Sequence, residues 1–169
     1  MSRQASHRRS DGGTRANGRR PRNVRGPVDL GVLNSHLGYF IRRIQLWVFQ
    51  DFIKTLAPID ISPAQFSVLT VIEANSGLSQ SDLAEALGIE TARLVRLLDE
   101  LDRRSLTRRM PSITDRRSHA LHLTQEGQRI LKRAKALADV HEARLAEIIG
   151  IKNHEFMIDI SKKSIDAAR

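Results

Sequence analysis

Arginine is concentrated in two parts of this 169-residue chain, and its guanidinium groups are suited to binding a polyanion. Between Arg103 and Arg117 six arginines stand against one acidic residue, Asp115. Residues 1–30 hold eight more arginines against two aspartates, and the whole chain has a formal net charge of +9. This distribution predicts a nucleic acid as partner. Because only 4% of the residues are aromatic, too few to stack successive bases of a single strand, a duplex fits better.

A second set of candidate contact residues lies on a predicted helix over residues 90–104. Leucines recur there at helical spacing and predict one buried face: Leu94, Leu97, Leu98 and Leu101. The residues we expect to meet DNA lie on the other side, near the helix N-terminus: Thr91, Arg93, Val95 and Arg96. Arginine at such a position can donate two hydrogen bonds to a guanine edge. Ordinary exposed helix charges are the alternative explanation of Arg93 and Arg96.

Several other chemistries lack the residues they need. The chain has no cysteine, which excludes disulfides, thiolate metal sites and thiol nucleophiles. The sequence contains no nucleophile elbow, no phosphate-binding glycine loop and no histidine pair at helical metal-ligand spacing. We therefore expect no enzyme, no cofactor and no metal site.

The elements that position the candidate residues are mostly helices. Apolar periodicity predicts a long helix over residues 30–56, and Ser62 with Pro63 begins a second one. Ser79 can cap a third, short helix that Gly88 ends, and the helix over 90–104 follows. Two short helices joined by a glycine-containing turn are typical of a helix-turn-helix.

A predicted hairpin follows the helix-turn-helix. Strands over residues 106–110 and 119–123 flank a turn that begins at Pro111, and a hairpin in this position is a wing. Thr124 can cap a long helix that ends at Gly150, before a final helix. The predicted fold class is mainly α with a small two-stranded β wing, a winged helix-turn-helix with a helical dimerisation region.

The chain divides by composition into a tail and one domain. Residues 1–30 are rich in arginine and poor in large apolar side chains, which predicts a disordered tail. Residues 31–169 form the domain, with the winged helix-turn-helix at about 62–124 and dimerisation helices at about 31–56 and 124–168. Those helices are too long to bury their apolar faces within one protomer, so we expect a homodimer on a pseudo-palindromic operator. No signal sequence and no run of 18 apolar residues is present, so we expect a cytoplasmic protein.

Two motifs in order give the chain a family resemblance. The first runs from Leu83 to Ile89 and continues into Arg96–Leu101; the second runs from Pro111 to Ser118, followed by Leu121–Thr124 and Glu126-Gly127. Together they resemble the MarR (multiple antibiotic resistance regulator) family of winged-helix repressors. Thr114 departs from the basic residue that many members carry at the wing tip, and the arginine-rich tail lies outside the family core.

The wing has its own candidate DNA contacts. Arg116 and Arg117 can enter a narrow minor groove, where the negative potential attracts arginine. A hairpin whose charges only keep it soluble is the alternative. The resemblance implies that Asp115 pairs with a wing arginine and holds it in position.

Aromatic and cationic residues predict a ligand site near the first helix. Tyr39, Trp47 and Phe66, with Arg42 and Arg43 beside them, could bind a planar ligand with an anionic end. Core or dimer packing is the alternative for these aromatic side chains. The resemblance implies aromatic acids, or their coenzyme A thioesters, as effectors.

These features predict a sequence-specific, DNA-binding transcriptional regulator, a ligand-responsive repressor released by an aromatic acid or its coenzyme A thioester. A basic RNA- or ribosome-associated module that uses the same wing is the alternative.

Overall fold

The computed structural model describes residues 28–111 and 119–168. The chain divides into two units, residues 1–36 and 37–169. In the first unit a 3₁₀ helix spans Gly31–Ser35, and most of the predicted tail lies outside the described residues. His36 is extended, with φ −96° and ψ 110°, and this interrupts the backbone hydrogen bonding of a helix. The prediction of one continuous helix from Leu30 was therefore wrong, because the α-helix begins only at Leu37.

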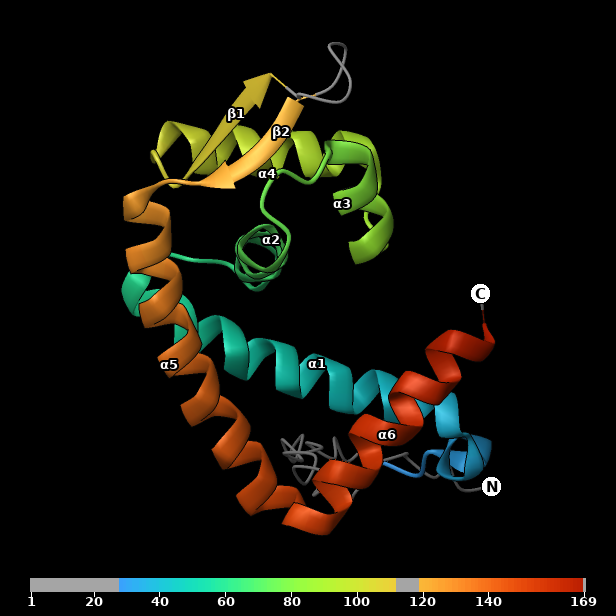
Figure 1. Cartoon of the computed structure of the whole chain (residues 1–169). Helices are drawn as coiled ribbons and strands as arrows, with labels where there is room; N and C mark the ends of the chain where they lie inside the picture. Colours follow the sequence, from blue (N-terminus) through green and yellow to red (C-terminus); the bar gives the residue numbers. More distant parts are fainter. Residues whose placement is uncertain (1–27, 112–118, 169) are drawn as a thin grey trace, which may run out of the picture. The chain divides into compact units, whose positions relative to one another are not determined.

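The second unit contains six α-helices and a two-stranded sheet among its described residues (Figure 1). The helices are α1 (Leu37–Leu56), α2 (Pro63–Ala74), α3 (Gln80–Leu87), α4 (Thr91–Arg103), α5 (Gln125–Ile149) and α6 (Ile151–Ala167). Strands β1 (Thr107–Pro111) and β2 (His119–Leu123) pair antiparallel, with Thr107 opposite Leu123 and Pro111 opposite His119. The predicted fold class, mainly α with a small two-stranded wing, is confirmed. Pro111 ends the first strand instead of starting the turn, and a proline is tolerated there because the strand lies at a sheet edge.

Local capping explains where the helices of the helix-turn-helix begin and end. The Ser62 hydroxyl accepts a hydrogen bond from Gln65 N, and the Gln65 side chain accepts one from Ser62 N, at 3.2 and 3.0 Å. Ser79 caps α3 in the same way through Asp82 N, at 3.2 Å. Gly88 ends α3 in the left-handed conformation, with φ 60°. These starts and stops agree with the sequence prediction.

The core lies where α2, α3, α4, the sheet and the first half of α5 meet. The fully buried side chains include one or more from each of these elements and from the end of α1: Leu56, Val68, Leu69, Ile72, Leu83, Leu94, Leu98, Leu101, Leu121 and Leu131. Taken singly, no described helix is long and apolar enough to span a bilayer. Leu37–Ile59 and Pro63–Ala74 meet that requirement only together, with a 73° bend between them, and the second of these helices is largely buried in the core.

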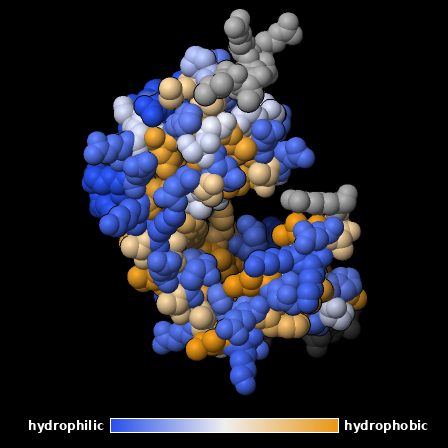
Figure 2. All heavy atoms as spheres, in the orientation of Figure 1, coloured by the Kyte–Doolittle hydropathy of each residue, from blue (hydrophilic) through white to orange (hydrophobic). Residues whose placement is uncertain are grey.

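Outside this core, α1 and α6 leave large apolar side chains exposed, and α6 has no buried residue at all. Orange spheres among the blue ones in the lower half of Figure 2 show part of this surface. On α1 the exposed set includes Phe40, Ile41, Ile44, Trp47 and Phe49, and on α6 it includes Ile151, Phe156, Ile158, Ile160 and Ile165. These two helices therefore have more apolar surface than one protomer buries.

Candidate DNA interface and effector region

The N-terminal turns of α4 present an exposed polar and cationic surface. Thr91, Arg93 and Arg96 are exposed, whereas Leu94, Leu98 and Leu101 on the opposite face are fully buried. Within the described residues neither guanidinium has an ion-pair partner. Val95 is half-buried, so less of its side chain is available for contact. The helix thus offers two arginines at the end that enters a major groove in a helix-turn-helix.

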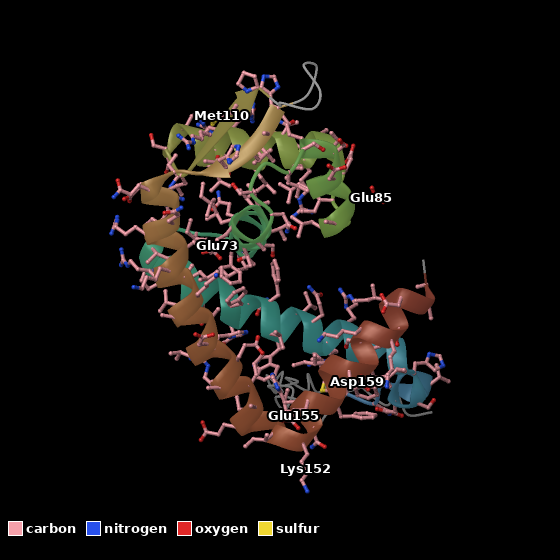
Figure 3. The ribbon with its side chains drawn as sticks, viewed as in Figure 1. Glu73, Glu85, Met110, Lys152, Glu155 and Asp159 are labelled. Atoms are coloured by element: carbon pink, nitrogen blue, oxygen red, sulfur yellow. The ribbon has the colours of Figure 1, made fainter. Side chains whose placement is uncertain are left out.

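The turn between α3 and α4 is held by backbone hydrogen bonds. Ile89 N donates to Ala84 O at 2.9 Å, and Gly88 N donates to Glu85 O at 3.1 Å. In Figure 3 the labelled Glu85 marks α3 and Met110 marks β1, with α4 passing behind the two strands in this view. Side chains of α3, α4 and the sheet pack into one hydrophobic core. The helix that carries the exposed Arg93 and Arg96 is therefore held in place by that core.

The sheet is attached to the helix-turn-helix at several points. Gly77 N donates to Leu121 O and Leu121 N donates to Leu78 O, both at 2.9 Å, so the loop after α2 pairs with β2. Leu106 N donates to Leu101 O, also at 2.9 Å, at the start of the first strand. Residues 112–118 lie outside the described part of the chain, so the expected contacts of Asp115, Arg116 and Arg117 stay predictions.

The arginines near the wing divide into two kinds. Arg108 is exposed on β1, whereas Arg109 places its guanidinium against two aspartates of α4. Arg104 donates to the carbonyl oxygens of Ile59 and Asp60, after the end of α1. At least two of the six arginines between 103 and 117 are therefore engaged inside the protomer.

The acidic residues of α4 have partners in other elements. Asp99 and Asp102 pair with Arg109 of β1, and Glu100 accepts a hydrogen bond from the Gln65 side chain at 3.0 Å. Charge counting along the sequence missed these links, which join α4 to the sheet and to α2. The sequence signal for a shared partner was the three-residue spacing of Asp99 and Asp102, which places both carboxylates on one face of the helix.

The five residues predicted to bind a ligand fall into separate groups in the protomer. Arg43 donates to the Tyr39 hydroxyl at 3.0 Å and lies 5.8 Å from the centre of its ring. Arg42 is exposed, and the Trp47 side chain is 39% exposed. Phe66 instead packs edge-on against Phe52, at 5.4 Å between ring centres. Tyr39 and Phe52 are separated by about 20 Å along α1, since each helical residue adds about 1.5 Å.

A buried polar group that the sequence did not reveal joins α1 to α5. The His141 side chain is 2% exposed, and its Nδ1 lies 2.9 Å from Asp51 Oδ2. Arg144 donates to the same oxygen at 2.5 Å and to Thr55 Oγ1 at 3.0 Å. The hydrogen bond from Arg144 holds the pKa of Asp51 below its ordinary value, more than desolvation raises it. The only sequence signal for this polar cluster was helical spacing: Asp51 and Thr55 are four residues apart on α1, and His141 and Arg144 are three residues apart on α5.

The His141 ring also contacts the aromatic pair. It stacks on Phe52 at 4.8 Å between ring centres with 27° between the planes, so Phe66, Phe52 and His141 form one continuous cluster. A cavity of about 550 Å³ opens elsewhere, between the end of α1, the start of α2 and the end of α4. Its lining includes Ile53, Gln65 and Arg104 but none of the five predicted ligand residues.

Known proteins with this arrangement of helices and wing show what kind of protein the chain is. A MarR family model matches residues 59–118. The structure of the transcriptional repressor CouR bound to a 23-mer DNA duplex superposes with a TM-score of 0.80. It is 41% identical to this chain and covers 85% of it, while the chain covers 100% of that repressor. The chain belongs to the MarR family. The resemblance seen in the two sequence motifs is thereby confirmed.

A second structure of CouR and one further relative are also similar to the chain. CouR bound to p-coumaroyl-CoA is 40% identical, with a TM-score of 0.75, covering 82% of this chain and 98% of that one. A transcriptional regulatory protein for the hcr operon of Thauera aromatica is 36% identical over 104 residues, which are 61% of this chain. The chain spans 63% of that relative's length. As a member of the MarR family, the chain is a winged-helix transcriptional regulator.

Proposed function

We propose that this chain is a homodimeric transcriptional repressor that binds a pseudo-palindromic operator and is released by the coenzyme A thioester of an aromatic acid. The observation that carries the proposal is the exposure of Arg93 and Arg96 in the N-terminal turns of α4. The chain is 41% identical in sequence to a repressor whose structure was solved on a DNA duplex. The protein then acts by binding rather than catalysis, in the cytoplasm.

The exposed apolar surfaces of α1 and α6 support the dimer. Burying Phe156 or Ile160, which are 62% and 46% exposed, needs a second chain because α6 has no core of its own. A two-fold dimer would place its two α4 helices in successive major grooves, with half-sites about 10 base pairs apart. The wing residues Arg116 and Arg117, positioned by Asp115, would reach the flanking minor grooves.

The identity of the effector rests on a relative and on the chemistry of α1. CouR, which is 40% identical, was solved with p-coumaroyl-CoA. An aromatic thioester needs an apolar slot for its acyl group and cations for its phosphates. Tyr39, Trp47 and Phe66 are the candidates for the acyl group, with Arg42 and Arg43 for the anionic part. Since they fall into separate groups in the protomer, a second chain or a ligand would have to complete the site.

Selection of DNA tests the function directly. The full-length protein would be presented with a randomised duplex pool, and we expect retention of one palindromic class. Arg96→Ala should weaken binding by about 1–3 kcal/mol and blur base discrimination within each half-site. Retention of structured RNA over every duplex would favour the RNA-associated alternative and contradict the proposal.

Titration with small molecules tests the effector. p-Coumaroyl-CoA, free p-coumarate and free coenzyme A would each be added to the protein–DNA complex while DNA release and tryptophan fluorescence are followed. Trp47 is the only tryptophan, so its emission reports directly on α1. We expect release by the thioester alone, reduced in Arg43→Ala and Trp47→Phe. Normal release in both variants would place the pocket elsewhere.

A further inference from the structure

We infer that Arg109 is a positioning residue that locks the two-stranded sheet onto the DNA-reading helix α4, and does not itself contact DNA. This inference rests on the proposed DNA-binding function and adds to it a residue that determines how helix and sheet are presented together. It concerns described residues only, the strands β1 and β2 and the helix α4.

The geometry of Arg109 carries the inference. One terminal nitrogen of its guanidinium lies 2.6 Å from Asp99 Oδ1, and its Nε lies 3.2 Å from Asp102 Oδ2. The two aspartates are three residues apart, so they project from the same face of α4. A single strand side chain therefore contacts two helix residues that are three positions apart.

A second link strengthens the same junction. The Thr107 hydroxyl, two residues earlier on the same face of β1, donates a hydrogen bond to Asp102 Oδ1. Thr107 is buried, and the side chains of Arg109 and Asp102 are each 28% exposed. Asp102 thus accepts a hydrogen bond from Thr107 and forms an ion pair with Arg109, whose buried Nε makes no hydrogen bond within the described residues.

Arg109 is suited to this position by its shape. Its guanidinium presents Nε and the terminal nitrogens in a rigid plane, so it can meet two carboxylates at once, whereas a lysine offers one compact charge. Without Arg109, two aspartates would lie unpaired on the helix that approaches a polyanion.

The neighbouring Arg108 provides a matched control within the strand. Successive strand residues point to opposite faces, and Arg108 is exposed and lacks an ion-pair partner within the described residues. Opposite Arg109 in the sheet is Leu121, which is also hydrogen-bonded to the loop after α2. Arg108 and Arg109 are adjacent and carry the same charge, but of these two arginines only Arg109 pairs with α4.

The experiment compares four variants of the full-length protein: Arg109→Gln, Arg109→Lys, Asp99→Asn and Arg108→Gln. Binding to a selected duplex and to an unrelated duplex is measured across a salt series. Amide hydrogen exchange is measured without DNA, and urea unfolding confirms that each variant is folded.

Positioning predicts a distinct set of results. Arg109→Gln and Asp99→Asn should both weaken specific binding by about tenfold and speed exchange in β1 and β2, with a smaller loss of the same kind for Arg109→Lys. Arg109→Gln should leave the salt slope unchanged, whereas Arg108→Gln should reduce it by about 0.9 if Arg108 meets a phosphate. The sign for Asp99→Asn is decisive, because removing a negative charge would by itself tighten DNA binding.

Two results would overturn the inference. Tighter binding by Asp99→Asn together with full activity of Arg109→Lys would make Arg109 a plain charge facing DNA. Unchanged exchange in β1 and β2 for both Arg109→Gln and Asp99→Asn would show that the pairing holds nothing in place. If no duplex were selected at all, the proposed function would fail, while the exchange measurement would still decide the part played by Arg109.

Discussion

The carbonyl oxygen of Leu106 occupies the space that a side chain on Gly127 would need: a Cβ built on Gly127 would lie 1.9 Å from that oxygen. Gly127 is in the first turn of α5, and its N–H donates to the capping Thr124 hydroxyl at 2.9 Å. Leu106 O also accepts from Thr124 N at 3.1 Å, so the start of the sheet and the start of α5 are packed backbone to backbone. Only glycine permits this approach.

We expect Gly127→Ala to lower the free energy of unfolding by about 1–3 kcal/mol, because the added methyl group would displace backbone rather than a flexible side chain. Urea denaturation measures this. Gly38→Ala is the control, since a Cβ at Gly38 in α1 has no atom within 4 Å. That change should be neutral or stabilising by up to about 1 kcal/mol. Equal effects at the two positions would contradict the explanation.

Ser105, which follows the C-cap residue Arg104 of α4, adopts the left-handed conformation with φ 55°, where glycine would be unstrained. The carbonyl oxygen of Ser105 accepts a hydrogen bond from the Thr124 hydroxyl at 2.6 Å, and a glycine would keep that carbonyl. Ser105→Gly should therefore raise the free energy of unfolding by about 1 kcal/mol, by relieving that strain. Thermal denaturation would be compared with Ser105→Ala, which keeps the Cβ and should bring no gain. A destabilised Ser105→Gly protein would show that the serine is favoured there.

Stability at low pH should depend on Asp51. The hydrogen bond from Arg144 lowers the pKa of Asp51 in the folded state, so its contribution to stability is present above the ordinary aspartate pKa of about 4. That contribution is lost as the pH falls through the lower folded-state pKa. Urea unfolding as a function of pH should show this loss in the native protein and not in Asp51→Asn. Parallel pH profiles for the two proteins would contradict the assignment.

Dimerisation should depend on the apolar surface of α6. Ile160→Glu places a charge on that surface and should shift the protein to monomer at micromolar concentration, measured by sedimentation velocity. Lys152→Glu also brings an acidic side chain to an exposed position of α6, as Figure 3 shows for Lys152, and should leave the dimer intact. A native protein that sediments as a stable, folded monomer would contradict the proposed dimer.

The arginine-rich tail should follow the DNA backbone. Deleting residues 1–28 removes eight arginines and Asp11, which lowers the net charge by seven. Non-specific affinity and salt slope should fall together, the slope by about 0.9 for each phosphate that the tail would have neutralised, while operator choice persists. Filter binding across a salt series on matched and unrelated duplexes measures both. An unchanged slope would exclude tail–DNA contact and favour a part for the tail near an anionic ligand.

Features that depend on near neighbours in the chain could be predicted from the sequence. Ser62, Ser79 and Thr124 cap their helices as expected, because an N-cap hydroxyl needs only a backbone N–H three residues ahead. The buried leucine face of α4 follows from 3.6-residue periodicity in the same way. Family membership could be predicted too, since its two motifs are short and ordered. The break at His36 could not, because an apolar pattern continues through it.

Pairings between distant segments were decided only by the fold. Arg108 and Arg109 are indistinguishable by type and place in the sequence, and only the side of β1 that turns toward α4 makes one of them the partner of Asp99. His141 and Asp51 are 90 positions apart, and the close packing of α1 on α5 is needed to bring them within 2.9 Å. Gly127 belongs to one of the two sequence motifs, but only the structure shows why glycine is needed there: the carbonyl oxygen of Leu106 leaves no space for a side chain. Local patterns set where helices begin, whereas partners are chosen by which faces pack together in three dimensions.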